Sequence, residues 1–356
     1  MILFINKVVC FVLEKWVSLI MAVVLIVILN GCDAGTEENS TPKLRFRLAL
    51  ELKPETKIWD VSRLFKENLE SASPKHGIKE GEIRVDFYDQ GSIGTERQLL
   101  EASKFGVIEV VQVNTAVVTT IEPSYAILNL PYLFDDEEHH QRALNGEAGE
   151  QLLQSLEHQQ LKGLGFYSAG FRNMFYHYPE ERPCPETPEN FKGLKIRVME
   201  SRTMISTMEA MGVSAVPIPF SELYQGIKTG VVDGAENSPK VFTSYKYEEA
   251  GCNCYTLTEH STDQHVLIAN NNWLESLDPN YKDRILEVAK NIIPEYNAIW
   301  QETTEKALIE MQEASVRVNK ISDKSPFVIA ADQVHEEFFN MYPEVSRELY
   351  DRIKSN

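Results

Sequence analysis

The stretch PFSELYQGIKTGVVDGAENSP, residues 219–239, joins a short helix signal to a strongly polar turn. Ser221 can cap a helix that ends at Gly230, because serine favours helix starts and glycine favours helix ends. We predict that residues 231–233 then re-enter a strand. Asn237 would lie at the polar end of that strand, where an amide can donate to a ligand and accept from it. Taken alone, the stretch also fits an ordinary capped helix followed by a loop.

Upstream of this stretch, strand and helix patterns alternate along the chain. Alternating apolar side chains over residues 44–50 and 83–88 predict two strands, and a β-branched run over 107–115 predicts a third, buried strand. Helices are expected between them, over residues 56–71 and from near Thr95. This β-α-β-α-β order is typical of an open α/β sheet, whose ligand lies in the crevice at the strand ends.

A second set of strands is expected near Leu164 and over residues 193–198. The chain has 356 residues, which is too long for one ordinary hydrophobic core. It is long enough for two domains, each with a hydrophobic core of its own. The sequence therefore predicts two α/β lobes with a cleft between them.

A long helix is expected to begin at Asp278 and Pro279, an N-cap residue followed by a proline in the first turn. Apolar residues then recur at steps of three or four as far as Met311. Pro294 lies inside this pattern and should kink the helix without ending it. Such a helix would be roughly 50 Å long, which is more than one lobe needs, so we predict that it spans both lobes.

The N-terminus is typical of an export signal. Lys7 and Lys15 precede an apolar run over residues 16–29, which is shorter than the roughly 20 residues that cross a bilayer. The sequence LNGC that ends at Cys32 is similar to a bacterial lipoprotein processing site, in which the cysteine becomes the lipidated first residue. An uncleaved N-terminal anchor is the alternative, because residues 8–13 are apolar too. Both interpretations place the body of the protein outside the cytoplasm.

The composition excludes several classes of function. The formal net charge is −18, and no cluster of basic residues with interleaved aromatic residues occurs, so nucleic acid is not an expected partner. No phosphate loop, nucleophile elbow or zinc-protease motif is found. The acidic run at residues 135–140, DDEEHH, is expected to start a solvated helix and not to bind a metal, because adjacent helical residues point in different directions. We expect neither a cofactor nor a metal ion.

Three cysteines lie in the body of the chain and allow one disulfide if the compartment is oxidising. Cys184 could pair with Cys252 or with Cys254. The sequence leaves both pairings open.

Several segments together resemble one family. The chain resembles the solute-binding proteins of tripartite ATP-independent periplasmic (TRAP) transporters, the DctP-like family, in three segments: PFSELYQGIKTGVVDGAENSP, GLKIRV at 193–198 and GFRNMF at 170–175. Three further segments match the family at similar spacing: YDQGSIGTERQLLEASKFG at 88–106, LNLPYLF at 128–134 and TEHS at 258–261. All of the segments occur in the order found in the family. The resemblance covers about residues 44–320. It implies a two-lobed periplasmic-binding-protein fold that closes around a small organic acid and delivers it to membrane permease subunits.

The resemblance also assigns binding residues in the second lobe. It implies that Arg197 forms a two-pronged salt bridge with the solute carboxylate. Strand alternation supports this role, because it directs Ile196 and Val198 to one face and Arg197 to the other. The planar guanidinium suits a carboxylate better than an ammonium group would. Three more residues of this lobe match the family's binding positions: Arg172, Asn237 and Phe220.

In the first lobe, the resemblance implies that Glu96 and Asn114 face the cleft, although each could also serve as a cap or turn residue. After the TEHS segment, residues 262–265 read TDQH where relatives carry a proline and a glutamate. His265 could therefore contact a hydroxyl or a second acid group, or it could be an ordinary packed histidine. These polar candidates favour a sugar acid, such as a uronate or an aldonate.

Two alternatives remain open at this point. One is a C4-dicarboxylate or another carboxylate bound by the same mechanism. The other is an exported enzyme that acts on acidic sugars, with His265, Glu96 or Glu236 as its acid or base. The family resemblance favours a binding protein that is not an enzyme.

The sequence suggests the following division of a monomeric, periplasmic protein tethered to the membrane through Cys32. The parts are a signal peptide at 1–32, a tether at 33–43, lobe I at 44–169 plus about 261–300, and lobe II at 170–260 plus about 301–356.

Overall fold

The computed structural model describes residues 41–356, and its strands form one mixed sheet. Along the sheet the strands follow the order β2-β1-β3-β8-β4-β7-β5-β6, and β9 pairs with β8. In chain order they are β1 (Leu44–Ala49), β2 (Ile83–Tyr88), β3 (Val110–Asn114), β4 (Leu161–Tyr176), β5 (Lys195–Val198), β6 (Ser214–Pro217), β7 (Gly234–Asn237), β8 (Cys254–Asn270) and β9 (Arg317–Asn319).

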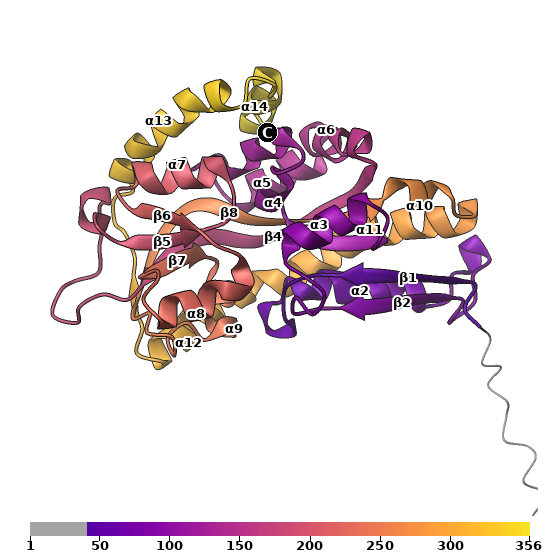
Figure 1. The fold of residues 1–356 in the computed structure, drawn as a ribbon, viewed down its shortest axis with the longest axis horizontal. Helices are drawn as coiled ribbons and strands as arrows, with labels where there is room; N and C mark the ends of the chain where they lie inside the picture. Colours follow the sequence, from indigo (N-terminus) through magenta and orange to yellow (C-terminus); the bar gives the residue numbers. More distant parts are fainter. Residues whose placement is uncertain (1–40) are drawn as a thin grey trace, which may run out of the picture. The chain divides into compact units, whose positions relative to one another are not determined.

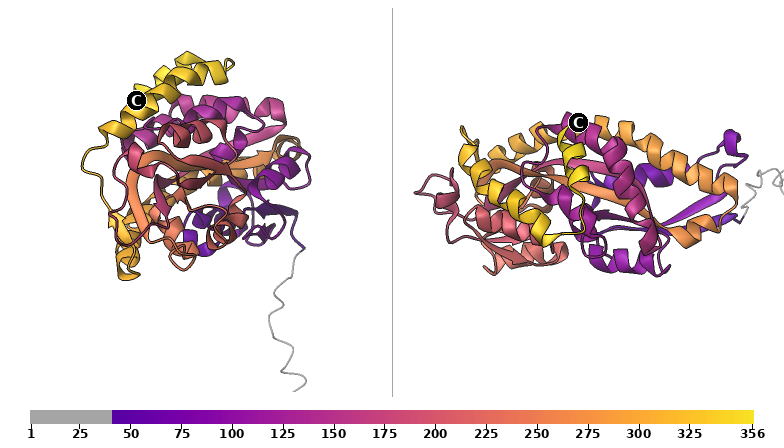
Figure 2. Two further views of the ribbon diagram at one scale, coloured as in Figure 1. Left: turned by 60° about the vertical axis from the view of Figure 1, so that its left-hand side comes forward. Right: turned by 90° about the horizontal axis from the view of Figure 1, so that it is seen from above.

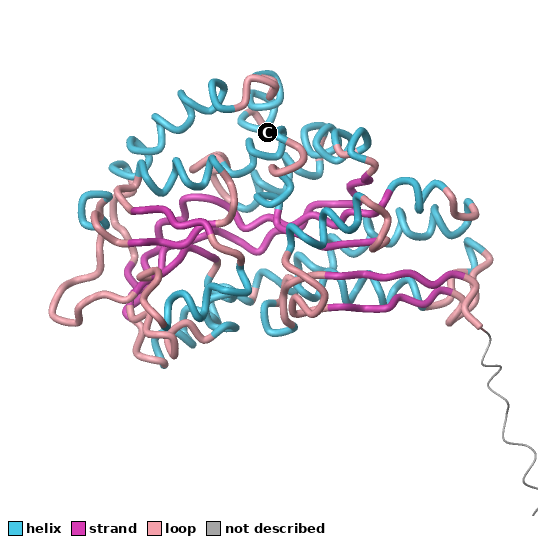
Figure 3. The backbone as a smooth tube through the Cα atoms, viewed as in Figure 1, coloured by secondary structure: helices cyan, strands magenta, loops and turns pink. Residues whose placement is uncertain are grey.

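Two long antiparallel strands, β4 and β8, join the two halves of the sheet (Figure 3). The last residues of β8 pair with β3, which continues to β1 and β2. The last residues of β4 pair with β7, which continues to β5 and β6. We call the part built on β1, β2 and β3 the first half and the part built on β5, β6 and β7 the second half. The predicted α/β fold with two lobes is confirmed.

Helices cover both faces of the sheet (Figure 1). In chain order they are α2 (Trp59–Glu70), α3 (Glu96–Lys104), α4 (Thr115–Val118), α5 (Glu137–Asn145), α6 (Glu147–Ser155), α7 (Arg202–Ala210), α8 (Leu223–Lys228), α9 (Pro239–Tyr245), α10 (Asn271–Glu275), α11 (Pro279–Gln301), α12 (Thr303–Glu313), α13 (Ser325–Met341) and α14 (Arg347–Lys354).

Apolar side chains fill both faces because neighbouring strand residues point in opposite directions. In β1, Leu48 and Ala49 belong to two different buried clusters, one under α2 and α11 and the other under α4, α5 and α6. In β4, Met174 and Phe175 likewise separate into the two clusters of the second half. Each half therefore has its own core, as the length of the chain predicted.

The predicted long helix is present but divided. α11 begins at Asp278, whose side chain caps it, and continues through Pro294 as expected. The helix breaks at Glu302, so the prediction of one continuous helix is wrong. α11 packs against α2 and β4, whereas α12 packs against α9 and β9, so the pair still extends over both halves.

The last two helices contact both halves. α13 lies beside α7, and α14 lies beside α5 and α6 (Figures 1 and 2). Leu349 and Ile353 of α14 join the core that contains Ala143 and Leu152 of the first half. The predicted lobe boundaries stay a prediction, and the C-terminal residues do not pack against the second half alone.

The stretch at 219–239 differs from its prediction in two details. Ser221 does not cap a helix with its side chain; it lies in a short 3₁₀ turn, Phe220–Glu222, that leads into α8. Residues 231–233 form a bend, and the strand begins only at Gly234. The expected helix end at Gly230 is correct, since its φ of 75° suits a residue without a side chain.

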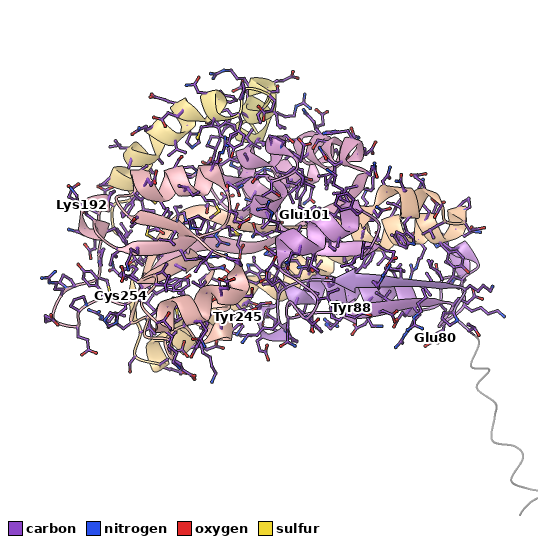
Figure 4. All side chains as sticks on the ribbon, viewed as in Figure 1. Glu80, Tyr88, Glu101, Lys192, Tyr245 and Cys254 are labelled. Carbon is purple, nitrogen blue, oxygen red and sulfur yellow. A yellow bond between two sulfur atoms is a disulfide. The ribbon has the colours of Figure 1, made fainter. Side chains whose placement is uncertain are left out.

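Two other local predictions can be compared with the structure. Asp136 caps α5 by accepting a hydrogen bond of 2.7 Å from the backbone N–H of His139, so the acidic run does start a helix. It is not wholly solvated, because His139 and His140 are buried. The open disulfide pairing is resolved: Cys184 bonds to Cys254, with 6.0 Å between the Cα atoms, and Cys252 is free and buried. Figure 4 marks Cys254 in the second half.

The predicted signal peptide, the lipidated Cys32 and most of the tether lie outside the described residues. Among residues 41–356, no helix has the length and apolar character required to cross a bilayer.

Candidate functional site

A crevice lies where the two halves meet, at the carboxyl ends of β1, β3, β5 and β7. It contains two adjoining hollows that share Glu96, Arg197, Met199 and Phe220. The smaller hollow is lined by all seven residues that the sequence singled out for binding: Arg197, Arg172, Asn237, Phe220, Glu96, Asn114 and His265.

Arg197 reaches this crevice because of the alternation in β5. Ile196 and Val198 are buried in the apolar core, and Arg197 points to the opposite face. Its Nε donates a hydrogen bond of 2.8 Å to the carbonyl oxygen of Ile218, and its guanidinium lies 5.6 Å from the centre of the Phe220 ring. These contacts hold the guanidinium in place without neutralising it.

The charge of Arg197 has no acidic partner among the described residues. The side chain is only 2% exposed, no carboxylate oxygen of residues 41–356 lies within 4.0 Å of it, and its Nη1 is buried without a hydrogen-bond partner in that part of the chain. Burial lowers the pKa of Arg197, an effect that the more distant Glu236 only partly offsets. A buried cation in this state is stabilised by any anion that enters the crevice.

Arg172 is also 2% exposed, but its charge is fully neutralised. Its Nε and Nη2 bind both carboxylate oxygens of Glu236, its Nη2 also donates to the Glu236 backbone carbonyl at 2.8 Å, and its Nη1 lies 2.5 Å from Asp263. Burial opposes the charged form, yet the two acids outweigh burial and raise the pKa of Arg172. Only one N–H of Nη1 remains for a solute.

The same pairing explains why the two acids stay ionised. Burial disfavours the charged forms of Glu236 and Asp263, but the Arg172 guanidinium, together with His260 at Glu236 and His265 at Asp263, outweighs burial and lowers the pKa of each carboxyl. Glu236 was one candidate acid or base of the alternative enzyme. A carboxylate locked to arginine in this way is a poor proton donor at neutral pH.

Glu96, Asn114 and His265 form the opposite wall together with Asp263. The backbone N–H of Asn114 donates to Glu96 Oε1 at 2.9 Å, and its Nδ2 donates to Asp263 Oδ1 at 2.8 Å. Asn114 Oδ1 caps α4 by accepting from the N–H of Ala116, so Asn114 performs the capping duty that the sequence left open. His265 pairs with Asn114 across β3 and β8.

Asn237 and Phe220 complete the wall on the side of the second half. Asn237 ends β7, and its Oδ1 accepts from the N–H of Ser238 at 2.7 Å. Its Nδ2 makes no hydrogen bond to another residue within 41–356 and remains a possible donor to a solute. Phe220 is held edge-on against Tyr245, with 4.9 Å between the ring centres.

Sequence reasoning missed Glu51, Asp263 and Glu200, which contribute further carboxylates to the crevice. Glu51 follows β1 directly, so the rule that ligands lie at strand ends could have found it. Asp263 precedes His265 by two residues on β8 and therefore shares its face. Leu52, Met199 and Val241 add apolar surface that no polar motif could indicate.

Glu51 also connects the two halves across the crevice. Its Oε2 accepts a hydrogen bond of 3.0 Å from the backbone N–H of Glu96 in the first half, and its Oε1 accepts one of 2.9 Å from the N–H of Ser221 in the second half. At the rim, Arg97 Nη1 forms a salt bridge of 3.0 Å with Glu200. These contacts hold both walls of the crevice together.

Known proteins share this architecture. The profile of a family described as bacterial extracellular solute-binding protein, family 7, matches residues 59–341. A solute-binding protein from Chromohalobacter salexigens is 31% identical over 274 residues, which cover 76% of this chain and 80% of that protein.

Two solved structures are similar over most of the chain. A TRAP periplasmic solute-binding protein from Roseobacter denitrificans, crystallised with β-D-glucuronate, has a TM-score of 0.80 and 27% identity, covering 88% of this chain and 99% of that one. A sugar acid binding protein from Advenella mimigardefordensis, in complex with galactonate, has a TM-score of 0.80 and 26% identity over 88% and 99% of the two chains.

The two arginines should differ in their contribution to stability. We expect Arg172→Met to lower the free energy of unfolding by about 3–5 kcal/mol, because it leaves two buried carboxylates without a partner. Arg197→Met should change it by less than about 1.5 kcal/mol, since it removes a buried charge that has no acidic partner and one hydrogen bond to a carbonyl. Urea unfolding of both variants measures the difference. Equal losses would contradict the charge balance described for the crevice.

Proposed function

The chain belongs to the bacterial extracellular solute-binding proteins of family 7, the DctP-like proteins of TRAP transporters, and we propose that it captures a sugar acid, a uronate or an aldonate, for delivery to a membrane permease. The observation that carries this proposal is the buried guanidinium of Arg197, which faces the crevice without an acidic partner within residues 41–356. A solute carboxylate would supply that partner through two parallel charge-assisted hydrogen bonds.

The rest of the crevice favours hydroxyl groups over a second carboxylate. Arg172 is already neutralised by Glu236 and Asp263, so it attracts a second anionic group only weakly. Glu51 and Glu96 add further acidic oxygens to the lining. Carboxylates and amides hydrogen-bond readily to sugar hydroxyls but repel a second negative charge. A sugar acid therefore fits better than a C4-dicarboxylate.

The similar structures support the same class of solute. The Roseobacter denitrificans protein was crystallised with β-D-glucuronate and the Advenella mimigardefordensis protein with galactonate. Both solutes combine one carboxylate with several hydroxyls, which matches one free arginine among acidic and amide groups. The relatives are solute-binding proteins, and we propose that this chain, too, binds its solute without changing it.

We propose that binding closes the crevice. Glu51 and the pair Arg97–Glu200 line the larger hollow and join the two halves, so their contacts form only when the walls are together. A solute that contacts both walls stabilises the closed form by the difference between its affinities for the closed and open forms.

Delivery requires the protein to stay near its permease. Family membership and the export signal favour the periplasm, and we propose that a lipid on Cys32 tethers the chain to the membrane. The polar residues that follow Cys32 would act as a flexible linker between the lipid anchor and the folded part of the protein.

Arg197→Ala should weaken the binding of D-glucuronate by about 3–5 kcal/mol, because the solute carboxylate loses two charge-assisted bonds in a desolvated crevice. Arg197→Lys should restore only part of this loss, since an ammonium cannot form the two-pronged contact. Titration calorimetry measures both. Arg45→Ala, which removes an exposed salt bridge with Asp86, serves as the control. Unchanged affinity of both Arg197 variants would refute the proposal.

Glu51→Ala should weaken D-glucuronate binding by about 1.5–3 kcal/mol, because two backbone N–H groups lose a charged acceptor when the walls meet. Arg97→Ala should cost less than about 1 kcal/mol, since its pair with Glu200 is half exposed. Small-angle scattering should show that solute compacts the wild-type protein more than it compacts Glu51→Ala. Equal compaction would argue against the role of Glu51 in closure.

Cys32→Ser should prevent attachment of a lipid to the protein, because the thiol that accepts the lipid is lost. Growth of the cells with a radiolabelled fatty acid, followed by recovery of the protein, checks this: the wild type should carry the label and the variant should not. A wild type without label would favour the uncleaved anchor instead.

A further inference from the structure

Negative groups outnumber positive groups in the crevice. Apart from the rim pair Arg97–Glu200, Arg172 and Arg197 supply two formal positive charges, whereas Glu51, Glu96, Asp263 and the neighbouring Glu236 supply four formal negative charges. A solute carboxylate would bring a fifth negative charge next to these buried side chains. Because unpaired buried charge is costly, one of the acids is expected to become neutral when the solute enters.

Hydrogen bonds distinguish Glu96 from the other three acids. Glu236 and Asp263 are bound to Arg172. Both oxygens of Glu51 accept backbone N–H groups, one from each wall of the crevice. The carboxylate of Glu96 accepts a single backbone hydrogen bond, from Asn114. Glu96 therefore receives the least support for its negative charge.

The groups that face Glu96 come from every element packed around it. They are Glu51 after β1, Arg97 next to it in α3, Arg172 on β4, Arg197 on β5, Tyr245 on α9, and Asp263 and His265 on β8. His265 Nδ1 lies 3.8 Å from Glu96 Oε1 and is buried with no hydrogen-bond partner within the described chain. His265 Nε2 lies 3.7 Å from Asp263.

This environment favours the neutral form of Glu96. Burial is the largest cause, Glu51 and Asp263 add to it, and His265 opposes it; together they raise the pKa of Glu96 to about 7. Around neutral pH, a carboxylate placed nearby at Arg197 would raise this pKa further through repulsion between like charges.

We propose that Glu96 takes up one proton from solvent when a sugar acid binds at Arg197, so that solute and proton are captured together. The proposal rests on the sugar-acid binding function proposed above. A protonated carboxyl can donate to a solute hydroxyl as well as accept from it, whereas a carboxylate only accepts. Proton uptake would thus remove a repulsive charge and supply a hydrogen-bond donor at the same position.

The test is calorimetric titration with D-glucuronate, and with galactonate as a second probe, in two buffers whose ionisation enthalpies differ: phosphate and Tris at pH 8, and MES and piperazine at pH 5.5. At pH 8 the difference between the buffers should correspond to an uptake of more than about half a proton per solute, and at pH 5.5 to almost none, since Glu96 is then already protonated. The dissociation constant should be flat below about pH 6 and rise by up to tenfold per pH unit above about pH 7.

Three variants locate the proton. Glu96→Gln should abolish the uptake at pH 8 and make the dissociation constant nearly independent of pH. His265→Gln should keep the uptake but move its onset to higher pH, because it removes the group that opposes protonation of Glu96. Glu51→Gln, a second crevice carboxylate, should weaken binding and retain the uptake. Loss of uptake in Glu51→Gln or His265→Gln, with uptake retained in Glu96→Gln, would overturn the assignment.

A measurement on the protein without solute tests the premise. The pKa of Glu96 is raised in the folded state, so its contribution to stability is fully present below the pKa of the unfolded chain and is lost as pH rises through about 7. The melting temperature of the wild type relative to Glu96→Gln should therefore fall between pH 5 and pH 8. A constant difference would contradict the premise.

The possible failures are distinguishable. If neither sugar acid binds at any pH, the proposed function fails and the proton inference fails with it. If a sugar acid binds with the same heat in both buffers at pH 8, the function stands and the coupled proton is excluded.

Discussion

The pairing of Arg172 with Glu236 and Asp263 is the interaction on which the crevice depends. The three residues come from β4, β7 and β8, and two of these strands run through both halves of the sheet. Their ion pairs connect strands of the two halves and use the charge of one of the two buried arginines among residues 41–356. Arg197, on the next strand beyond β7, is left as the one arginine of the described crevice without an acid. The ion cluster around Arg172 therefore lies close to Arg197 in the crevice. Because Glu236 and Asp263 pair with Arg172, Arg197 keeps a charge that a solute could pair with.

The two buried arginines of the crevice therefore differ in their partners. From sequence, Arg172 and Arg197 are alike, since each is a basic residue in a predicted strand. The structure separates them through partners that are distant in the chain: Asp263 lies 91 residues from Arg172, and Glu236 lies 64 residues from it. Side-chain pairing across that separation depends on the register of β4 with β7 and β8, and no local pattern encodes it.

Local patterns predicted most elements of the fold, whereas the family resemblance supplied most of the residues that line the crevice. Alternation placed Arg197 opposite Ile196 and Val198, and a capping signal located the start of α11. Helix starts were also expected near Thr95 and in the acidic run at residues 135–140, where α3 and α5 begin. The predictions were wrong or incomplete where contacts between distant parts of the chain determine the local structure or the role of a residue. The helix expected through residue 311 breaks at Glu302, where the packing partner changes from the first half to the second. Glu51 escaped notice because its role depends on the N–H of Ser221, which lies 170 residues away.

The excess of acidic side chains around Arg197 would make the crevice selective for solutes with a single negative charge. A monocarboxylate at Arg197 would gain a strong ion pair, whereas a second carboxylate or a phosphate would meet Glu51 and Asp263 in a medium of low dielectric constant. Repulsion of that kind lowers the affinity for a dianion more than the affinity for a monoanion, and specificity is the difference between those two affinities. The same acids can pair with hydroxyls, so the groups that reject dianions are those that would hold the polyol part of a sugar acid.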